Sequence, residues 1–240
     1  MLVAAVAAAL AVVGATTAGG AKTAAPQKKI TIGFSHYAAV IPFYRAMIAG
    51  TQADAKKYGY TVQVTDSGFD PAKQTSQIQD MITKKVDFIL ASPGDENALV
   101  PAYKAAKRAA IPVMSIGNHI ADSLESSLEF SFYGRRWQEV GALKATMMAK
   151  KVGGKGDFIA IRGPSGVAFV TEEKAGYKSA LAKYPNIKTV FDQNAKDLTN
   201  AEGLRLAQDA LTAHPNAAGI WTETDDLAAG VLQALKARGK

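Results

Sequence analysis

Residues 29–50 read KITIGFSHYAAVIPFYRAMIAG, and this stretch decides the fold. It opens with an apolar, largely β-branched run at residues 30–34, which is the pattern of a short strand. Residues 35–37 predict a loop, and Pro42 predicts the start of a helix, because the first turn has no use for the N–H that proline lacks. Strand, loop and helix in this order place the loop at the crevice where open α/β sheets bind ligands.

The rest of the chain repeats this alternation. Further strands are predicted at residues 61–65, 86–91, 111–116, 127–132, 157–161, 188–191 and 218–222. Further helices are predicted from Asp70, the expected N-cap, and at residues 97–109, 136–150, 171–183, 200–213 and 226–237. Strands that alternate with helices of about 10–15 residues predict βαβ units and parallel sheets.

The predicted elements form two βαβ halves. They cover residues 28–132 and 133–240, about 105 residues each, which is within the usual size of a domain. The crossover between them is expected at residues 132–134.

For helix 136–150 the side chains expected inward are Trp137, Val140, Leu143, Met147 and Met148. For helix 226–237 they are Leu227, Val231, Leu232 and Leu235.

The first 25 residues differ in kind from the rest. Residues 2–13 are apolar and uncharged, and small residues follow them, as in the h-region and cleavage region of an export signal. Cleavage is expected after Ala18 or Ala21. A membrane anchor is the alternative, because residues 2–21 lack charge over about the 20 residues that a span requires. Alanine and glycine dominate the second half of this run, which favours the cleaved signal.

Composition excludes several functions. The net charge is +7, but lysine and arginine occur in scattered pairs with no basic run interleaved with aromatics, so nucleic acid is not the expected partner. The chain has no cysteine, which excludes disulfides, thiolate metal sites and a cysteine nucleophile. No cofactor motif is present, and His36, His119 and His214 stand too far apart to predict a metal site.

Two short motifs admit a functional and a structural interpretation. The loop GPSG at residues 163–166 follows a strand and precedes a helix, so it could bind a phosphate through its N–H groups. It lacks the partner residues of the Walker and dinucleotide motifs, which favours a structural turn. Glu223, Asp225 and Asp226 could perform acid–base work, although capping of the next helix by Asp225 or Asp226 is the commoner cause of such a cluster. His214 is expected to end a helix.

No catalytic constellation emerges, so a binding site is the better prediction. The strand ends of the two halves could face each other, and they carry aromatic and small polar residues. Ring faces that stack on a sugar, with amides and hydroxyls at its rim, would form a carbohydrate site. The candidate residues are Phe43, Tyr44, Asn118, Thr171, Leu198 and Thr224.

The sequence from residue 29 to residue 240 resembles a known family. The similarity rests on PFYRAMIAGTQADAKKYGYTV, DPAKQTSQIQDMITKKVDFILASPGDENALVPAYKAAKRAAIPV, AGYKSALAKYP and LTAHPNAAGIWTETDDLAAGVLQALKARGK. These segments resemble the periplasmic substrate-binding proteins of ABC importers, in the ribose-binding branch. The resemblance implies two Rossmann-like lobes joined by a hinge, closure on a small ligand, and a membrane permease as partner. It also implies a periplasmic monomer without a cofactor.

The resemblance is uneven at the ligand site. Phe43 and Tyr44 match the aromatic pair that stacks on the sugar. The Asp-Arg pair after the fourth strand corresponds to Gly117 and Asn118, and the Asp-Asn pair at the first crossover to Tyr133 and Gly134. In the second lobe, the expected arginine, aromatic residue and asparagine correspond to Thr171, Leu198 and Thr224. These departures leave the fold intact and argue against ribose as the ligand.

Two other function classes stay open at this point. One is the ligand-sensing core of a repressor or chemoreceptor, of which the repressor would need a helix-turn-helix ahead of residue 29. The other is an α/β enzyme, for which no nucleophile–base pair is present. The sequence ends after an amphipathic helix, where a βαβ series continues with a strand. We therefore expect the chain to lack the C-terminal part of the second lobe, and residues 1–240 alone to be poorly soluble and to bind ligand weakly or not at all.

Overall fold

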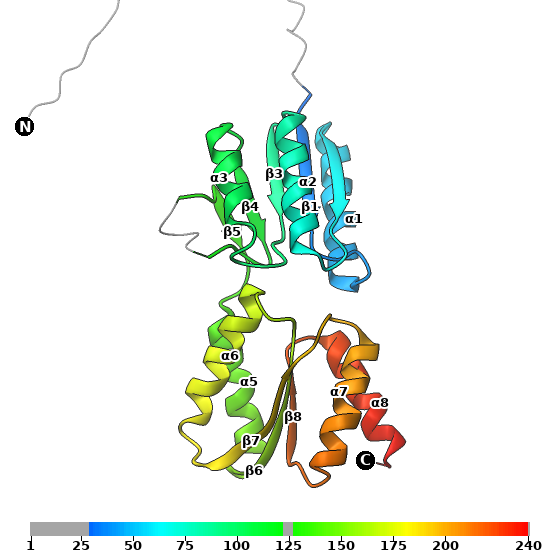
Figure 1. The fold of residues 1–240 in the computed structure, drawn as a ribbon, viewed down its shortest axis with the longest axis vertical. Helices are drawn as coiled ribbons and strands as arrows, with labels where there is room; N and C mark the ends of the chain where they lie inside the picture. The colour runs from blue at the N-terminus through cyan, green and yellow to red at the C-terminus, as the bar shows by residue number, and fades with distance from the viewer. Residues whose placement is uncertain (1–28, 122–126, 240) are drawn as a thin grey trace, which may run out of the picture.

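A computed structural model describes residues 29–121 and 127–239, so the predicted export signal lies outside the described residues. The chain forms two parallel sheets with strand orders β2-β1-β3-β4-β5 and β7-β6-β8. Figure 1 shows them stacked along the long axis of the molecule. We call the elements from β1 to β5 the first lobe and those from α5 to α8 the second lobe. Two α/β lobes with parallel sheets confirm the predicted fold class.

The first lobe contains five parallel strands and the helices that connect them. Its elements are β1 (Thr31–His36), α1 (Pro42–Tyr58), β2 (Thr61–Asp66), α2 (Pro71–Thr83), β3 (Phe88–Ala91), α3 (Val100–Arg108), β4 (Val113–Ile116) and β5 (Ser131–Tyr133). Helices α2 and α3 pack side by side.

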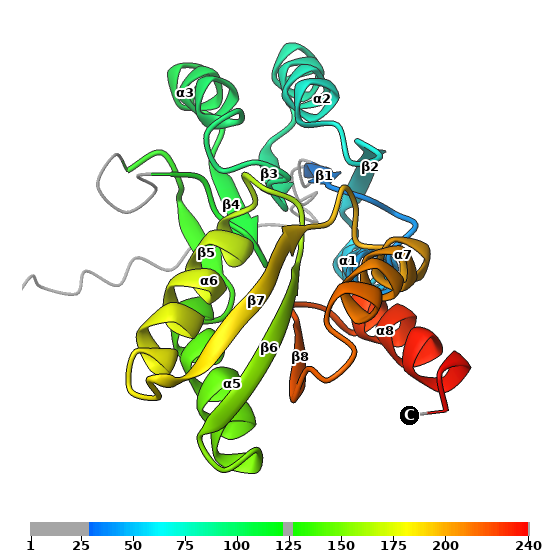
Figure 2. The same cartoon turned by 60° about the horizontal axis from the view of Figure 1, so that its bottom comes forward.

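The second lobe surrounds a three-stranded sheet. Its elements are α5 (Trp137–Lys151), β6 (Lys155–Arg162), α6 (Ala168–Leu181), β7 (Asn186–Asn194), α7 (Asn200–Ala213), β8 (Gly219–Thr222) and α8 (Asp225–Ala237). Helices α5 and α6 cover one face of this sheet, and α7 and α8 cover the other (Figure 2). The predicted boundary at residues 132 and 133 falls at the end of β5 and stays a prediction.

Local signals in the sequence set several element ends. Pro42 begins α1, and Gly59 ends it in the left-handed conformation, at φ 73°. The Asp70 carboxylate accepts hydrogen bonds from the N–H groups of Ala72 and Lys73, at 2.9 and 3.0 Å, so Asp70 caps α2 as predicted. His214 ends α7, where its N–H donates to the Ala210 carbonyl.

Two predicted strand ends were wrong. Ser35 and His36 belong to β1 and not to a loop, because they pair in parallel with Thr65 and Asp66 of β2. The strand predicted from residue 127 begins only at Ser131. Ser127 itself adopts a positive φ of 47°, in the left-handed region and outside the β region that a serine in a strand occupies.

The predicted inward face of α5 was wrong in part, since Trp137 and Met148 pack against core clusters as predicted. Leu143 and Met147 are exposed, and the buried residues are Gly141, Ala145 and Ala149. The reason is the close approach of α6: a Cβ at Gly141 would overlap the Glu173 carbonyl oxygen. Small residues face a neighbouring helix when the two backbones touch, so the larger side chains turn outward.

Helix α8 repeats this behaviour. Leu232 is exposed, whereas Gly230 and Ala234 are buried against α7. The prediction that Asp225 or Asp226 caps the helix was wrong as well. The cap is Thr224, whose Oγ1 accepts a hydrogen bond from the Leu227 N–H at 3.3 Å.

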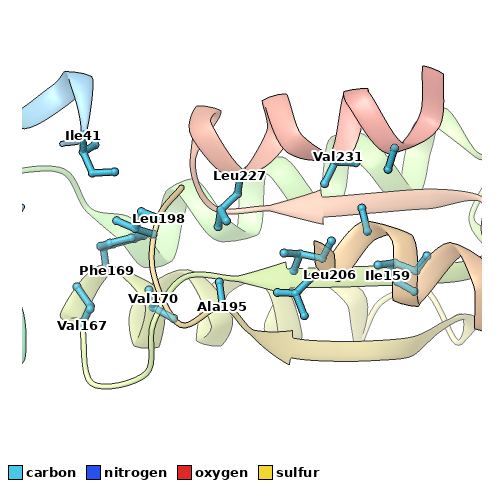
Figure 3. Packing of buried hydrophobic residues seen from close by; sticks show 14 of the residues in the cluster. Ile41, Ile159, Val167, Phe169, Val170, Ala195, Leu198, Leu206, Leu227 and Val231 are labelled. Carbon is cyan, nitrogen blue, oxygen red and sulfur yellow. The ribbon is translucent and has the colours of Figure 1, made fainter. Parts of the chain in front are cut away.

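The core divides into clusters, of which one spans both lobes. Tyr37, Ala38, Ile41 and Tyr44 of the first lobe join the apolar core that lies between β6, α7 and α8. Figure 3 shows this cluster, with Ile41 at its first-lobe end. Apolar burial therefore contributes to the association of the lobes. Within residues 29–121 and 127–239, no helix is long and apolar enough to cross a bilayer.

Candidate interlobe binding site

The carboxyl ends of the strands of both lobes converge where the lobes meet. The Glu96 N–H, in the segment after β3, donates to the Gly166 carbonyl in the loop after β6, at 2.8 Å. Tyr37, directly after β1, is buried in the cluster shared with Leu198. This is the position at which open α/β sheets bind ligands, so it is the candidate site.

The two predicted aromatic residues have different environments. Tyr44 is buried, and its ring stacks against His36 with centroids 6.2 Å apart. Burial raises the pKa of Tyr44 to about 12, and the nearby side chains of Ser92 and Asn118 oppose this rise only in part. Phe43 is 53% exposed, and its ring meets the Tyr44 ring edge-on at 5.4 Å. The Phe43 ring is thus accessible from solvent, and the buried Tyr44 ring packs against it.

Asn118 lies beside this aromatic pair. Its side chain is buried, and its Nδ2 donates to the Pro93 carbonyl at 3.0 Å. The Phe43 ring approaches the neighbouring Gly117 to within 3.6 Å of the position that a Cβ would occupy. The fold therefore brings together Phe43, Tyr44 and Asn118, which come from two different crossovers of the first sheet.

The three candidate residues of the second lobe differ in their burial and in their contacts. Leu198 is buried in the shared cluster. Thr171 is exposed on α6, and its Oγ1 lies 3.5 Å from Glu96 Oε1 of the first lobe. The Thr224 hydroxyl caps α8. Leu198 and Thr171 thus lie against the first lobe, whereas the oxygen of Thr224 already has a structural partner.

Two side chains hold the loop at residues 163–166 in place. The Gly163 N–H donates to Glu223 Oε2 at 2.6 Å, and the Gly163 carbonyl accepts from Asn194 Nδ2 at 2.7 Å. Desolvation by burial raises the pKa of Glu223 to about 7. Because a carboxylate occupies the Gly163 N–H, this loop fits the structural interpretation better than a phosphate site.

Two features of the site were not predicted. Gln74 is buried one turn into α2, where its Nε2 donates to the Ser92 carbonyl and its Oε1 accepts from the Gly94 N–H, both at 2.9 Å. It fixes the loop after β3. His119 of the first lobe reaches Glu172 of the second lobe at 2.7 Å. Helical spacing places Gln74 on the same face of α2 as Ile78 and Met81 and so could have predicted its burial. A polar side chain is not normally assigned to a buried face, and Gln74 was therefore missed.

The described residues contain no group of three or more histidine, cysteine, aspartate or glutamate side chains that could hold a metal ion. His36 is buried at the end of β1, with its Nδ1 3.6 Å from Asp66 Oδ1, and desolvation lowers its pKa. The chemistry that the site offers is therefore stacking, hydrogen bonding and apolar contact.

Known proteins show the same organisation. Residues 32–240 match the periplasmic binding protein domain family. The ribose import binding protein of Salmonella typhimurium is 29% identical over 83% of this chain and 65% of its own length. The xylitol-binding protein of Mycolicibacterium smegmatis is 30% identical over 95% of this chain and 64% of its own length. The chain therefore spans just under two thirds of these relatives.

Solved structures agree with the sequence relatives. A periplasmic solute-binding protein of an ABC transporter from Actinobacillus succinogenes, with bound D-allose, has a TM-score of 0.77 and 29% identity. The match covers 88% of this chain and 74% of that one. A galactofuranose-binding protein has a TM-score of 0.82 and 26% identity, over 88% and 72% of the two chains. These relatives are binding proteins, as the resemblance in the sequence predicted. The chain belongs to the periplasmic binding protein family, in its ribose-binding-protein-like branch.

Proposed function

We propose that this protein captures a small polyhydroxylated ligand, a sugar or a polyol, between its two lobes and delivers it to the permease of an ABC importer. The observation that carries this proposal is the exposed Phe43 ring, which packs edge-on against Tyr44 of the core cluster shared by both lobes and approaches Gly117, the neighbour of the buried Asn118. Its relatives include binding proteins for ribose, xylitol and galactofuranose and a solute-binding protein with bound D-allose, which supports the ligand class.

The proposed ligand contacts divide by chemistry. Phe43 supplies a stacking face for the C–H side of a sugar ring, with Tyr44 packed behind it. Asn118 supplies an amide for the hydroxyl rim, and Thr171 supplies a hydroxyl from the opposite lobe. Leu198 supplies apolar surface. Thr224 completes the proposed set at the start of α8, where its N-capping bond leaves one oxygen lone pair to accept from a ligand hydroxyl.

Entry of a ligand requires the lobes to separate. Tyr37, Ile41 and Tyr44 lie in one core cluster with second-lobe residues, so separation of the lobes must expose part of this apolar surface. A ligand that contacts both lobes then favours the closed form through its differential affinity. Binding and closure are therefore one coupled equilibrium.

A thermal-shift screen of the chain tests the ligand class. The panel contains pentoses, hexoses, xylitol, inositols and glycerol, with amino acids and nucleosides as other classes. A ligand at 100 times its Kd should stabilise the protein by about 2.7 kcal/mol, or roughly 5–10 °C in melting temperature. Stabilisation only by amino acids or nucleosides would contradict the sugar assignment, and no stabilisation by any class would contradict ligand capture.

Alanine at Phe43 or Asn118 should weaken ligand binding without unfolding the protein. Loss of an aromatic partner costs about 0.5–1.5 kcal/mol beyond its burial, which raises Kd by roughly 2- to 13-fold. Calorimetric titration of Phe43→Ala, Asn118→Ala and the control Tyr58→Ala measures this change. Tyr58 is an equally exposed aromatic residue at the other end of α1. Wild-type affinity in both site variants would show that the site is misplaced.

Export to the periplasm is the proposed location. The relatives named above include periplasmic proteins, and residues 2–21 have the pattern of an export signal. Mass spectrometry of the N-terminus of the cellular protein should find a chain that begins after Ala18 or Ala21. A chain that retains Met1 in the cytosolic fraction would rule out this location.

A further inference from the structure

One charged pair joins the lobes outside the proposed ligand contacts. His119 follows β4 in the first lobe, and its Nε2 lies 2.7 Å from Glu172 Oε1 on α6 of the second lobe. The other ring nitrogen, Nδ1, lies 2.9 Å from the Ile120 carbonyl oxygen. The exposed fractions of the two side chains are 21% and 33%, so both are partly shielded from water.

This geometry defines the charge of the ring. A carbonyl oxygen and a carboxylate oxygen can only accept hydrogen bonds, so both ring nitrogens must donate. A neutral imidazole has one N–H, whereas the imidazolium has two. The hydrogen bond to Glu172 accordingly raises the pKa of His119 to about 9, against an opposing effect of burial. The pair is therefore a charge-assisted hydrogen bond.

The first lobe holds the ring in place. Phe132 packs edge-on against it, with centroids 5.1 Å apart, and Glu129 Oε1 accepts a hydrogen bond from the Ile120 N–H at 3.1 Å. The charged groups that face His119 are all acidic: Glu96 and Glu129 from the first lobe and Glu172 from α6. None of these three groups is a cation that could compete with His119 for the Glu172 carboxylate.

A second contact lies beside this pair. The Glu96 N–H donates to the Gly166 carbonyl at 2.8 Å, and Thr171 Oγ1, one residue before Glu172, lies 3.5 Å from Glu96 Oε1. The same short surface of α6 and its preceding loop thus meets the first lobe at several polar points. Opening of the lobes must break the His119–Glu172 pair together with them.

We propose that His119 and Glu172 form an interlobe latch that stabilises the closed arrangement and so raises ligand affinity without contacting the ligand. The affinity part of this proposal rests on the proposed function. The closure part does not, because the latch joins the lobes through the chain's own residues. His119 and Glu172 are positioning residues in this account.

The latch makes closure depend on pH. In an open arrangement His119 loses Glu172, so its pKa falls toward the ordinary value of 6.5. The closed form then holds the proton more tightly. The stabilisation of the closed form relative to the open form is fully present below about pH 6.5 and is lost as the pH rises through about 9. Because both groups are partly exposed, solvent screening limits the expected effect on Kd to about fivefold.

The first experiment measures closure without any ligand. The chain has no cysteine, so Asp54→Cys on α1 and Gln208→Cys on α7 give two unique labelling sites. Figure 1 shows these helices on the side away from the connection between β5 and α5. Energy transfer between the labels should fall as the pH rises from 6 to 10. In the His119→Gln and Glu172→Gln backgrounds the transfer should be lower at pH 6 and independent of pH.

The second experiment measures affinity for the sugar or polyol that gives the largest thermal shift. Wild-type Kd should rise about fivefold between pH 6.5 and pH 9.5, and both variants should show the weaker value at both pH values. His214→Gln, a histidine at the end of α7, is the matched control and should keep the wild-type profile. Unchanged pH profiles of transfer in the two latch variants would overturn the proposal. If no panel compound binds, the proposed function fails, and the energy-transfer titration still decides the latch.

Discussion

Replacement of Arg162 by alanine is expected to lower the free energy of unfolding by about 3–5 kcal/mol, the usual cost of removing one partner of a buried ion pair. Arg162 is fully buried at the end of β6. Its Nε donates to Asp192 Oδ1 at 2.5 Å, and its Nη1 lies 3.4 Å from Glu223 Oε1. The guanidinium also stacks on the Tyr177 ring, 4.8 Å from the centroid. Without Arg162, no cation of residues 29–121 and 127–239 is in hydrogen-bond contact with the Glu223 carboxylate.

The loss should be larger at pH 8 than at pH 5. Burial already raises the pKa of Glu223 to about 7, and Arg162 opposes that rise. In the variant the carboxyl is protonated at pH 5, so the uncompensated charge appears only as the pH rises. Urea denaturation at both pH values measures the difference, with Arg136→Ala as the control. Arg136 is 84% exposed, and its pair with Glu139 should contribute little. Equal losses in the two arginine variants would contradict the buried-network account.

Alanine at Gly176 should destabilise the second lobe by at least about 1–3 kcal/mol, the typical cost of overpacking. A Cβ at this position would overlap the Gln138 carbonyl oxygen and lie 2.7 Å from the Ala142 nitrogen, so the obstacle is the backbone of α5. The helix pair α5–α6 would have to separate. Backbone atoms cannot rotate away as a flexible side chain can, and the clash is therefore costly.

Alanine at Gly50 should change the free energy of unfolding in the opposite direction. Gly50 lies inside α1, and a Cβ there would meet no atom within 4 Å. Alanine should stabilise the protein by about 0.5–1 kcal/mol, because it restricts the unfolded chain and favours the helix. Thermal or urea denaturation of the two variants gives the comparison. An unchanged or raised stability in Gly176→Ala would contradict the close α5–α6 contact, and destabilisation by Gly50→Ala would contradict the open space beside α1.

The sequence predicted those parts of the fold that depend on local pattern. Helix α7 was predicted with its exact bounds, because its apolar spacing and the expected end at His214 agree there; the structure adds Thr199 as the N-cap. The faces of α5 and α8 were predicted only in part: Leu227 and Val231 of α8 are buried as predicted, whereas Leu143 of α5 and Leu232 of α8 are exposed. Their burial depends on glycines that allow two helix backbones to touch, and hydrophobicity alone assigns Leu143 and Leu232 to the core.

The candidate site could be inferred from the sequence only where it uses residues after strand ends, and its role in binding stays a prediction. Phe43, Tyr44 and Asn118 were expected together, and the fold places them together. The interlobe pair of His119 and Glu172 was missed, since its members lie 53 residues apart and each has an ordinary local context. Arg162 was missed for the same reason, because its partner Glu223 lies 61 residues away. Such contacts follow from topology and not from local pattern.

One sugar or polyol is proposed to close the two lobes on itself, and the labelled pair at positions 54 and 208 reports this closure. Energy transfer is measured at pH 7 while the best ligand from the thermal-shift screen is added. The account predicts a rise that saturates at one ligand per chain, with a midpoint equal to the calorimetric Kd, and a midpoint displaced to higher concentration in Phe43→Ala. Saturating ligand that stabilises the protein and leaves the transfer unchanged would contradict capture between the lobes.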